Sequence, residues 1–248
     1  MTLIFEPVKL EHPVSTGFSL KNLARLLSRN ARCGDIVIVS SKVISYCEGR
    51  LVDLSEVEPS ERAIEIGRKY GLDEKVAELV LREADKVLGG CCGFLLTLKF
   101  GILCPNAGID FSNAPNGFAV LYPRDPVKSA KTLRKELEKM VGKVGVVISD
   151  SRILPLRRGV SGIAIAACGF EAIVDERGRR DVFGRELKST FRNIADMLAS
   201  ASQLLMGEAD ELVPAVLARG LKVRFVDECP NLSVPLRECL YRDLFQDS

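Results

Sequence analysis

The stretch Val144-Gly145-Val146-Val147-Ile148, followed directly by Ser149-Asp150-Ser151, decides how the rest of this sequence is interpreted. An apolar, β-branched run of this length is typical of a strand buried on both faces of a sheet. A second such run, Ile36 to Val39, ends in Ser40-Ser41-Lys42. In open α/β sheets, ligands bind beyond the carboxyl ends of the strands. The two runs therefore predict a sheet that presents hydroxyls, a lysine and a carboxylate to a ligand, although a strand-end turn with a solvated lysine is the alternative for Lys42.

A second polar motif, Asn106-Ala107-Gly108-Ile109-Asp110-Phe111-Ser112-Asn113, follows an apolar run that ends at Cys104. The glycine lets the backbone adopt a positive φ or approach a ligand closely, so Asp110 and Asn113 can face one site from a short loop. Asp110 and Asp150 together offer only oxygen ligands, which Mg²⁺ and Mn²⁺ prefer. The alternative is that Asp110 and Asn113 only cap the turn through side-chain hydrogen bonds.

Composition and charge exclude several classes of protein. The 248 residues are 47% hydrophobic and 27% charged, as in an ordinary globular protein of one elaborated domain or two small ones. The 35 basic and 33 acidic residues leave a net charge of +2, so no large basic field for nucleic acid is expected. No apolar run approaches the ~20 residues of a membrane span, and no signal-peptide pattern is present. We therefore expect a cytoplasmic protein that binds neither nucleic acid nor membrane.

The reactive residue types narrow the chemistry. The eight cysteines include no CxxC pair and are expected to stay reduced in the cytoplasm, with Cys91, Cys104 and Cys168 buried in hydrophobic runs. A single histidine, His12, excludes a multi-histidine metal site, and neither a Walker A nor a GxGxxG pattern occurs. Carboxylates, hydroxyls, lysines and arginines remain. This inventory suits metal-assisted phosphoryl transfer, in which the protein supplies positioning and charge.

Hydrophobic periodicity predicts the helices. Helices are expected after Ser19, after Ser60, from Asp73 to Val87 and from Ser129 to Met140. An alanine-rich helix, expected to be the longest, should follow Leu187 and run to Leu205, with a surface suited to helix pairing or dimer contacts. The acidic cluster after it, Glu208-Ala209-Asp210-Glu211, either adds a carboxylate to the metal site or forms a solvated loop.

These motifs occur in the order found in the coenzyme F420-0:γ-glutamyl ligase family, which the sequence resembles from about Phe5 to Leu221. The segments that carry the resemblance are Ser40-Ser41-Lys42-Val43-Ile44-Ser45, Glu48-Gly49-Arg50, Lys99-Phe100-Gly101, Asn106-Ala107-Gly108-Ile109-Asp110, Ser112-Asn113, Asp125-Pro126, Ser149-Asp150-Ser151, Gly184-Arg185-Glu186-Leu187, Met206-Gly207-Glu208 and Arg219-Gly220.

The resemblance implies a fold, a quaternary state and a reaction. The fold would be α/β (α+β), with a mixed sheet and a smaller second subdomain, in a homodimer; residues 1–248 would form one F420 ligase-like domain or two interleaved subdomains. The reaction would be a GTP-dependent ligation of L-glutamate, through a γ-linkage, to the carboxylate of F420-0. The γ-phosphoryl group of GTP would first pass to that carboxylate, and the glutamate amine would then displace phosphate.

The resemblance also implies site residues and cofactors. Two divalent ions, Mg²⁺ or Mn²⁺, are expected, with K⁺ as a further candidate and GTP as co-substrate. Asp110, Asp150 and Arg157 would be catalytic. The metal ligands would be Asp110, Asp150, Glu208 and Ser151, which stands where the family usually has threonine. The nucleotide would be bound by Ser40, Ser41, Lys42, Asn113, Gly207 and Glu208.

The sequence departs from the family pattern near the expected phosphate and acceptor pockets. Family members usually have a lysine where Tyr46 stands, and a small glycine–arginine turn where this chain has Arg152-Ile153-Leu154. If residues 42 to 46 formed a strand, Lys42 would lie ~13 Å along it from Tyr46 and would not replace that lysine directly. Two other functions therefore stay open: a paralogue that ligates an amino acid to another carboxylate, and a nucleotide-binding protein without catalysis.

Overall fold

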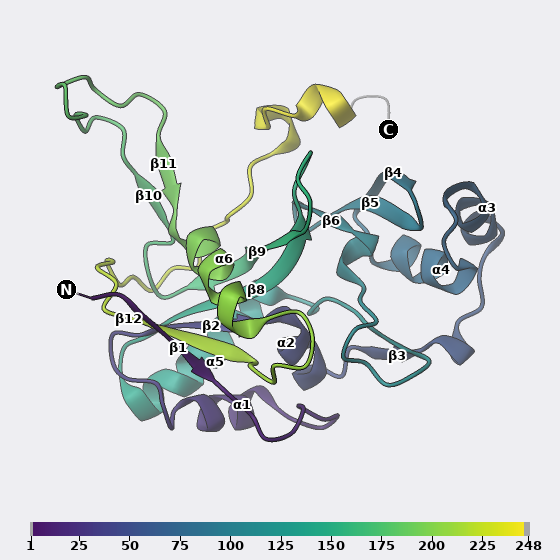
Figure 1. Ribbon diagram of the computed structural model, residues 1–248, viewed down its shortest axis with the longest axis horizontal. Helices are drawn as coiled ribbons and strands as arrows, with labels where there is room; N and C mark the ends of the chain where they lie inside the picture. The colour runs from purple at the N-terminus through teal and green to yellow at the C-terminus, as the bar shows by residue number, and fades with distance from the viewer. Residues whose placement is uncertain (1, 246–248) are drawn as a thin grey trace.

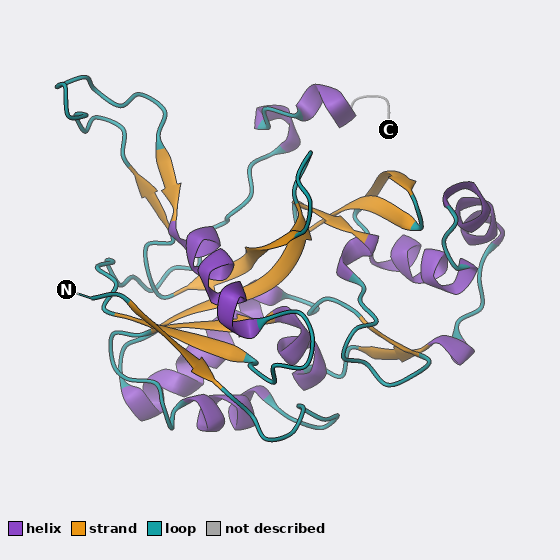
Figure 2. Ribbon diagram, in the orientation of Figure 1, coloured by secondary structure: helices purple, strands orange, loops and turns teal. Residues whose placement is uncertain are grey.

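A five-stranded mixed sheet forms the centre of the protein, in a computed structural model that describes residues 2–245 (Figures 1 and 2). The strand order is β1-β12-β2-β8-β9, in which β2 and β8 are parallel and every other neighbouring pair is antiparallel. The strands span Ile4–Val8 (β1), Ile36–Ser40 (β2), Gly145–Ile153 (β8), Val160–Cys168 (β9) and Ala215–Arg219 (β12). The prediction of a mixed sheet is confirmed.

The two predicted apolar runs lie in the middle of this sheet. Ile36 to Val39 and Val146 to Ile148 are fully buried, because helices cover both faces. Helices α1 (Leu20–Leu27) and α5 (Pro126–Val141) pack on one face and α6 (Ile194–Met206) on the other, as Figure 1 shows. The helices begin at side-chain caps on Ser19, Asp125 and Asn193, each of which accepts a backbone N–H of its helix.

The chain between β2 and α5 builds a smaller lobe with its own hydrophobic cluster (Figure 1, right). Helices α3 (Glu61–Tyr70) and α4 (Glu74–Glu83) pack there beside a three-stranded sheet and a two-stranded ribbon. The sheet consists of β4 (Lys86–Cys91), β5 (Phe94–Lys99) and β6 (Ile102–Pro105); the ribbon consists of β3 (Leu51–Asp53) and β7 (Phe118–Val120). The prediction of a smaller second subdomain concerns this lobe.

Two helix predictions are wrong. The helix expected from Asp73 to Val87 ends at Glu83, because Ala84 is extended and the chain then enters β4, which pairs with β5. The helix expected after Leu187 begins only at Ile194, since residues 191–193 form β11 (Phe191–Asn193), which pairs with β10 (Ile173–Asp175). With 13 residues α6 is also shorter than α5, which has 16. In both segments tertiary strand pairing overrides local helix periodicity.

The hairpin β10–β11 and the loop that joins its strands form an arm that extends away from the sheet (Figure 1, upper left). The side chains of Val182 and Phe183 in this loop are 93% and 86% exposed, and Phe191 is 51% exposed. Apolar side chains gathered on a projecting segment are unusual on the surface of a protein that acts alone.

The cysteines differ from expectation in two ways. Cys168, at the end of β9, forms a disulfide with Cys229, so the prediction that all eight are reduced is wrong. Cys91 is exposed, because it lies at the turn of the β4–β5 hairpin, whereas Cys104 is buried as expected.

Two short 3-10 turns, Leu236–Glu238 and Arg242–Phe245, follow Cys229 in the chain. Within residues 2–245, no helix combines the length and the apolar character needed to cross a membrane.

Glu78 joins the two helices of the smaller lobe through buried hydrogen bonds. Its carboxylate accepts the backbone N–H of Ser60 at 3.0 Å, the Ser60 hydroxyl at 2.6 Å and the Arg82 Nε–H at 2.8 Å. The bonds from Ser60, and then that from Arg82, lower the pKa of Glu78 to about 2. Because the folded-state pKa lies below the unfolded one, the stabilisation is present above about pH 4.5 and is lost as the pH falls toward about 2.

We predict that Glu78→Gln lowers the free energy of unfolding at pH 7 by about 1–3 kcal/mol, because a charged acceptor of buried hydrogen bonds is lost. The difference from wild type should shrink at pH 3, where the wild-type carboxylate has lost most of this stabilisation. Urea unfolding of the wild type and the variant at both pH values measures this difference in the free energy of unfolding. Glu74→Gln, on the exposed face of the same helix, is the matched control, and an equal difference at both pH values would contradict the prediction.

Candidate active site

Helix α2 (Ser41–Cys47) begins directly where β2 ends, and this junction carries the predicted Ser40-Ser41-Lys42. Because the segment is a helix and not a strand, Lys42 and Tyr46 are one turn apart on the same helix face, and the expected ~13 Å separation is wrong. The Tyr46 hydroxyl donates to the backbone carbonyl of Asn113 at 2.8 Å. Tyr46 thus ties α2 to the loop that bears Asp110.

The loop that bears Asp110 is held by its own motif. The Asn106 side-chain carbonyl accepts the backbone N–H of Leu95 at 2.8 Å, so this buried asparagine is structural. Gly108 has φ +74°, and a Cβ at this position would lie 2.3 Å from the ring of Tyr122. The backbone of Asp110 pairs with Val120 through two hydrogen bonds of 3.0 and 2.8 Å. The carboxylate of Asp110 therefore projects from a turn that these backbone hydrogen bonds and the Tyr122 ring hold in place.

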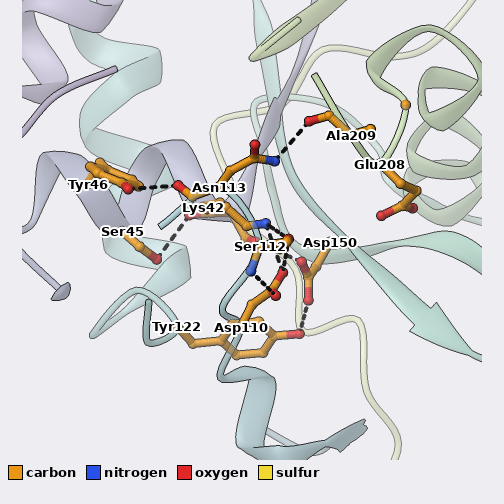
Figure 3. A network of polar contacts seen from close by, with 12 residues as sticks. Lys42, Ser45, Tyr46, Asp110, Ser112, Asn113, Tyr122, Asp150, Glu208 and Ala209 are labelled. Atoms are coloured by element: carbon orange, nitrogen blue, oxygen red, sulfur yellow. Dashed lines mark hydrogen bonds and ion pairs between the residues drawn. The ribbon is translucent and has the colours of Figure 1, made fainter. Parts of the chain in front are cut away.

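Asp110 forms an ion pair with Lys42 across the site (Figure 3). The Lys42 Nζ lies 2.8 Å from Asp110 Oδ2 and donates to the Ser112 hydroxyl at 2.6 Å. Ser112 in turn donates its N–H and its hydroxyl to Asp110, at 2.8 and 2.9 Å. Partial burial would raise the pKa of Asp110, but the hydrogen bonds and charge of Lys42, with those from Ser112, lower it below its ordinary value. Asp110 is therefore a carboxylate at neutral pH.

Asp150 follows the last parallel pair of the sheet, Ser40 with Ser149, while β8 itself continues to Ile153 in its pairing with β9. Its Oδ1 accepts the Ser41 hydroxyl at 2.9 Å, and its Oδ2 accepts the hydroxyl of Tyr122 (Figure 3). Within residues 2–245, no lysine or arginine forms an ion pair with it. Burial, which removes water from the carboxylate, raises the pKa of Asp150 above its ordinary value, and the negative charge of Asp110 raises it further.

A cavity of about 550 Å³ opens on one side of the two carboxylates. It gathers most of the predicted nucleotide and metal residues, namely Ser40, Lys42, Asp110, Asn113, Asp150, Ser151, Gly207 and Glu208. The Asn113 amide donates to the carbonyl of Ala209 at 3.0 Å, which closes one wall. Ser41 is buried, donates its hydroxyl to Asp150 and lines not this cavity but a second one.

A second cavity, of about 300 Å³, adjoins the first at the two carboxylates. It shares Lys42, Asp110, Asp150 and Ser151 with the larger cavity. Much of its remaining wall comes from the smaller lobe and from the β8–β9 hairpin, including Phe94, Pro105, Ile109, Tyr122, Ile153 and Val160. The two carboxylates therefore line both cavities, so that molecules bound in the two cavities would meet at Asp110 and Asp150.

Two predicted site residues lie apart from the aspartates. Arg157 is exposed in the turn of the β8–β9 hairpin and lines neither cavity. Glu208 lines the larger cavity, but its carboxylate accepts the side-chain amide of Gln203. In the described part of the chain, no three histidine, cysteine, aspartate or glutamate side chains converge on one point. Arg152 belongs to the segment 152–154, which differs from the family pattern. Its guanidinium lies 4.0 Å from the carboxylate of Asp196.

The donor set around the aspartates fits a divalent cation. Asp150 is a carboxylate without a cationic partner in residues 2–245, next to a second carboxylate, and an added cation would satisfy both. Each oxygen of Asp150 accepts one protein hydrogen bond, which leaves lone pairs for a metal. Asp110, Asp150 and the Ser151 hydroxyl could hold the ion, and the all-oxygen set favours Mg²⁺ or Mn²⁺.

Sequence reasoning missed Tyr122. Nothing in Ala119 to Pro123 distinguishes this tyrosine from an apolar strand residue, and its contact with Asp150 depends on how the smaller lobe meets the sheet. The wall of the larger cavity also includes Leu10, Pro13, Val14, Ser15 and Thr16, whose place beside the strand ends follows from the pairing of β1 with β12.

Comparisons with known proteins show the family of this chain. The profile of the F420-0:Gamma-glutamyl ligase family matches residues 17–220. The Coenzyme F420:L-glutamate ligase of Methanopyrus kandleri is 44% identical over 225 residues, covering 89% of this chain and 88% of that protein. The ligases of the same name from Methanocaldococcus jannaschii and Archaeoglobus fulgidus are 43% and 44% identical, covering 89% and 82% of both chains. This chain belongs to the F420-0:γ-glutamyl ligase family.

Proposed function

We propose that the protein is a GTP- and divalent-metal-dependent ligase that joins L-glutamate to the carboxylate of coenzyme F420-0 through a γ-linkage. The observation that carries the proposal is the pair Asp110 and Asp150, placed where two cavities meet. The names of the family and of the relatives supply the acceptor and the amino acid. The chemistry that two carboxylates between two cavities support is phosphoryl transfer from one bound molecule to another.

The larger cavity is assigned to GTP. Its volume, about 550 Å³, falls in the range of cofactor pockets, and it is lined by hydroxyls, the Asn113 amide and Lys42. The Lys42 ammonium now neutralises Asp110 at 2.8 Å. When a cation takes that role, the lysine becomes available to the phosphates, and its helix neighbour Tyr46 holds Asn113 in the cavity wall. Lys42 can thus serve where the family usually has a lysine at position 46.

The smaller cavity is assigned to the acceptor carboxylate and the glutamate amine. Apolar side chains of Phe94, Pro105 and Ile153 line it, and these suit a substrate larger than a free amino acid. Because Lys42, Asp110, Asp150 and Ser151 line both cavities, an acceptor carboxylate bound there would face the nucleotide phosphates. Ile153 belongs to the segment that departs from the family pattern, so this cavity is where acceptor preference would differ.

The reaction then divides into two displacements. An oxygen of the acceptor carboxylate attacks the γ-phosphorus of GTP, and GDP leaves. The glutamate amine attacks the resulting acyl phosphate, forms the C–N bond, loses a proton and expels inorganic phosphate. The bound cations would supply neutralisation of the phosphoryl charge. The protein's own residues hold the two substrates in line, and such positioning can contribute several kcal/mol.

We predict that incubation with F420-0, L-glutamate, GTP and Mn²⁺ gives a glutamate adduct of F420-0, detected by mass spectrometry, together with GDP and phosphate. Asp110→Asn and Asp150→Asn should each lower this turnover by about 100-fold or more, because charge stabilisation at the transferring phosphoryl group is lost. Circular dichroism should show intact folds, since asparagine keeps the shape of both side chains. Asp53→Asn, outside both cavities, is the control.

The outcomes separate the three candidate functions. Full activity in either aspartate variant would show that the proposed metal site is wrong. An adduct on another carboxylate, with none on F420-0, would indicate the paralogous amino-acid ligase. Tight binding of GTP and Mn²⁺ without phosphate release in the presence of any acceptor would indicate a nucleotide-binding protein without catalysis.

The proposed homodimer would form through the β10–β11 arm. Val182 and Phe183 give the arm apolar side chains that residues 2–245 leave almost fully exposed, while Phe191 is half-exposed, with Arg177 over its ring. A second copy of the chain would bury them, and the arm's reach away from the sheet (Figure 2) makes its tip accessible to that copy.

We predict that Val182→Ser combined with Phe183→Ser shifts the protein from dimer to monomer, measured by size-exclusion chromatography with light scattering. The two side chains are 93% and 86% exposed, so the fold of each protomer should be unchanged. The control is Leu156→Ser, an exposed leucine in the β8–β9 turn. A dimer that persists at equal protein concentration in the arm variant would contradict the prediction.

A further inference from the structure

The consecutive residues Leu121 and Tyr122 face different hydrophobic cores. Leu121, 4% exposed, packs in the cluster of the smaller lobe with Ile109 and Leu95. Tyr122, also 4% exposed, packs in the cluster beneath the central sheet, which includes Ile148. The chain therefore passes from the lobe to the sheet at Tyr122. A contact made by the Tyr122 side chain therefore couples the position of the smaller lobe to that of the central sheet.

The polar end of Tyr122 makes such a contact. Its hydroxyl donates to Asp150 Oδ2, while Ser41 donates to Oδ1 at 2.9 Å (Figure 3). Two donors, one on each oxygen, fix the rotation of the carboxylate. Ser41 belongs to the same β2–α2 junction as Lys42, beside β8. Among the described residues 2–245, only the hydrogen bond from Tyr122 joins the Asp150 side chain to the segment that carries Asp110.

The ring of Tyr122 is held at the base of the Asp110 loop. It lies against Gly108, where a Cβ would be 2.3 Å from two ring atoms and 2.4 Å from a third. Gly108 is two residues before Asp110, and Val120, which pairs with the Asp110 backbone, is two residues before Tyr122. The ring, the loop and the short β7 ribbon thus form one braced unit. Any displacement of the ring would change the separation of the two carboxylates.

We infer that Tyr122 is a positioning residue that sets the separation and orientation of Asp110 and Asp150, and through them the affinity of the site for a divalent cation. The inference deepens the proposed function and rests on its metal site. Hydrogen-bond partners of metal ligands typically contribute 10–100-fold to metal affinity, because they hold the ligands in the binding geometry. Tyr122 would act through Asp150 and would not itself touch substrate.

The test measures Mn²⁺ binding directly, from the electron paramagnetic resonance signal of free Mn²⁺ during titration of the full-length protein. Tyr122→Phe keeps the ring against Gly108 and removes only the hydroxyl. We expect its Mn²⁺ dissociation constant to rise about 10–100-fold. In the ligase assay the variant should need correspondingly more Mn²⁺ for half-maximal activity and regain near wild-type kcat at saturating Mn²⁺. Tyr70→Phe, in the core of the smaller lobe, is the matched control and should bind Mn²⁺ as wild type.

A second variant perturbs the same contact from its other side. Gly108→Ala places a methyl group where the Tyr122 ring lies, so it should also weaken Mn²⁺ binding. Combined with Tyr122→Phe, it should cost much less than the sum of the two single effects, because they disturb one interaction. Tyr122→Phe with wild-type Mn²⁺ affinity would overturn this inference alone. A wild-type protein that binds no Mn²⁺ would overturn the metal site of the proposed function and this inference with it.

Discussion

The parallel pairing of β2 with β8 is the constraint on which the rest of the structure depends. The register from Ile36 with Gly145 to Ser40 with Ser149 sets two strand ends side by side. Polar side chains at those ends then meet without further adjustment, and the Ser41 hydroxyl reaches Asp150 at 2.9 Å. The pairing is secured by apolar side chains on both faces, because a one-residue register shift would move Ile38 or Val147 into the core on the opposite face and disrupt its packing. Burial of the strands therefore fixes the chemistry at their ends.

Charge balance at the site follows from this placement. The two carboxylates are close enough for Asp110 to raise the pKa of Asp150, yet the ammonium of Lys42 pairs only with Asp110. Asp150 therefore has hydroxyl partners but no cationic one among residues 2–245. A site with this imbalance gains free energy when a cation enters. The imbalance is a stronger argument for a metal than the mere presence of acidic residues, since Glu208 is acidic and instead accepts a neutral amide.

The sequence predicted what depends on local pattern. The strands β2 and β8 follow from their β-branched runs, and the caps at Ser19 and Ser60 from their position before apolar periodicity. Hydrophobic periodicity predicted the wrong element where long-range strand pairing determines the structure. It predicted helix at the start of β4 and over β11, which instead pair with β5 and β10. Sequence reasoning placed Ser40, Lys42 and Asp150 at one site correctly, because residues at neighbouring strand ends must be near. It missed Tyr122 because that contact depends on the docking of the lobe, which no local spacing encodes.

The smaller lobe is inserted in the chain between the two parallel strands, and this connection has a further consequence. The wall of the larger cavity comes from residues 10–16, the β2–α2 junction, the end of β8, residues 203–214 and the loop 110–115, whereas Phe94, Pro105, Ile109 and Tyr122 line only the smaller cavity and come from the insertion. Substitutions on the inserted surface at Phe94 or Pro105 would reshape one cavity and leave the other intact. The architecture is thus modular: under the proposed function, one part of the chain can change which molecule is accepted while the other keeps the source of chemical energy.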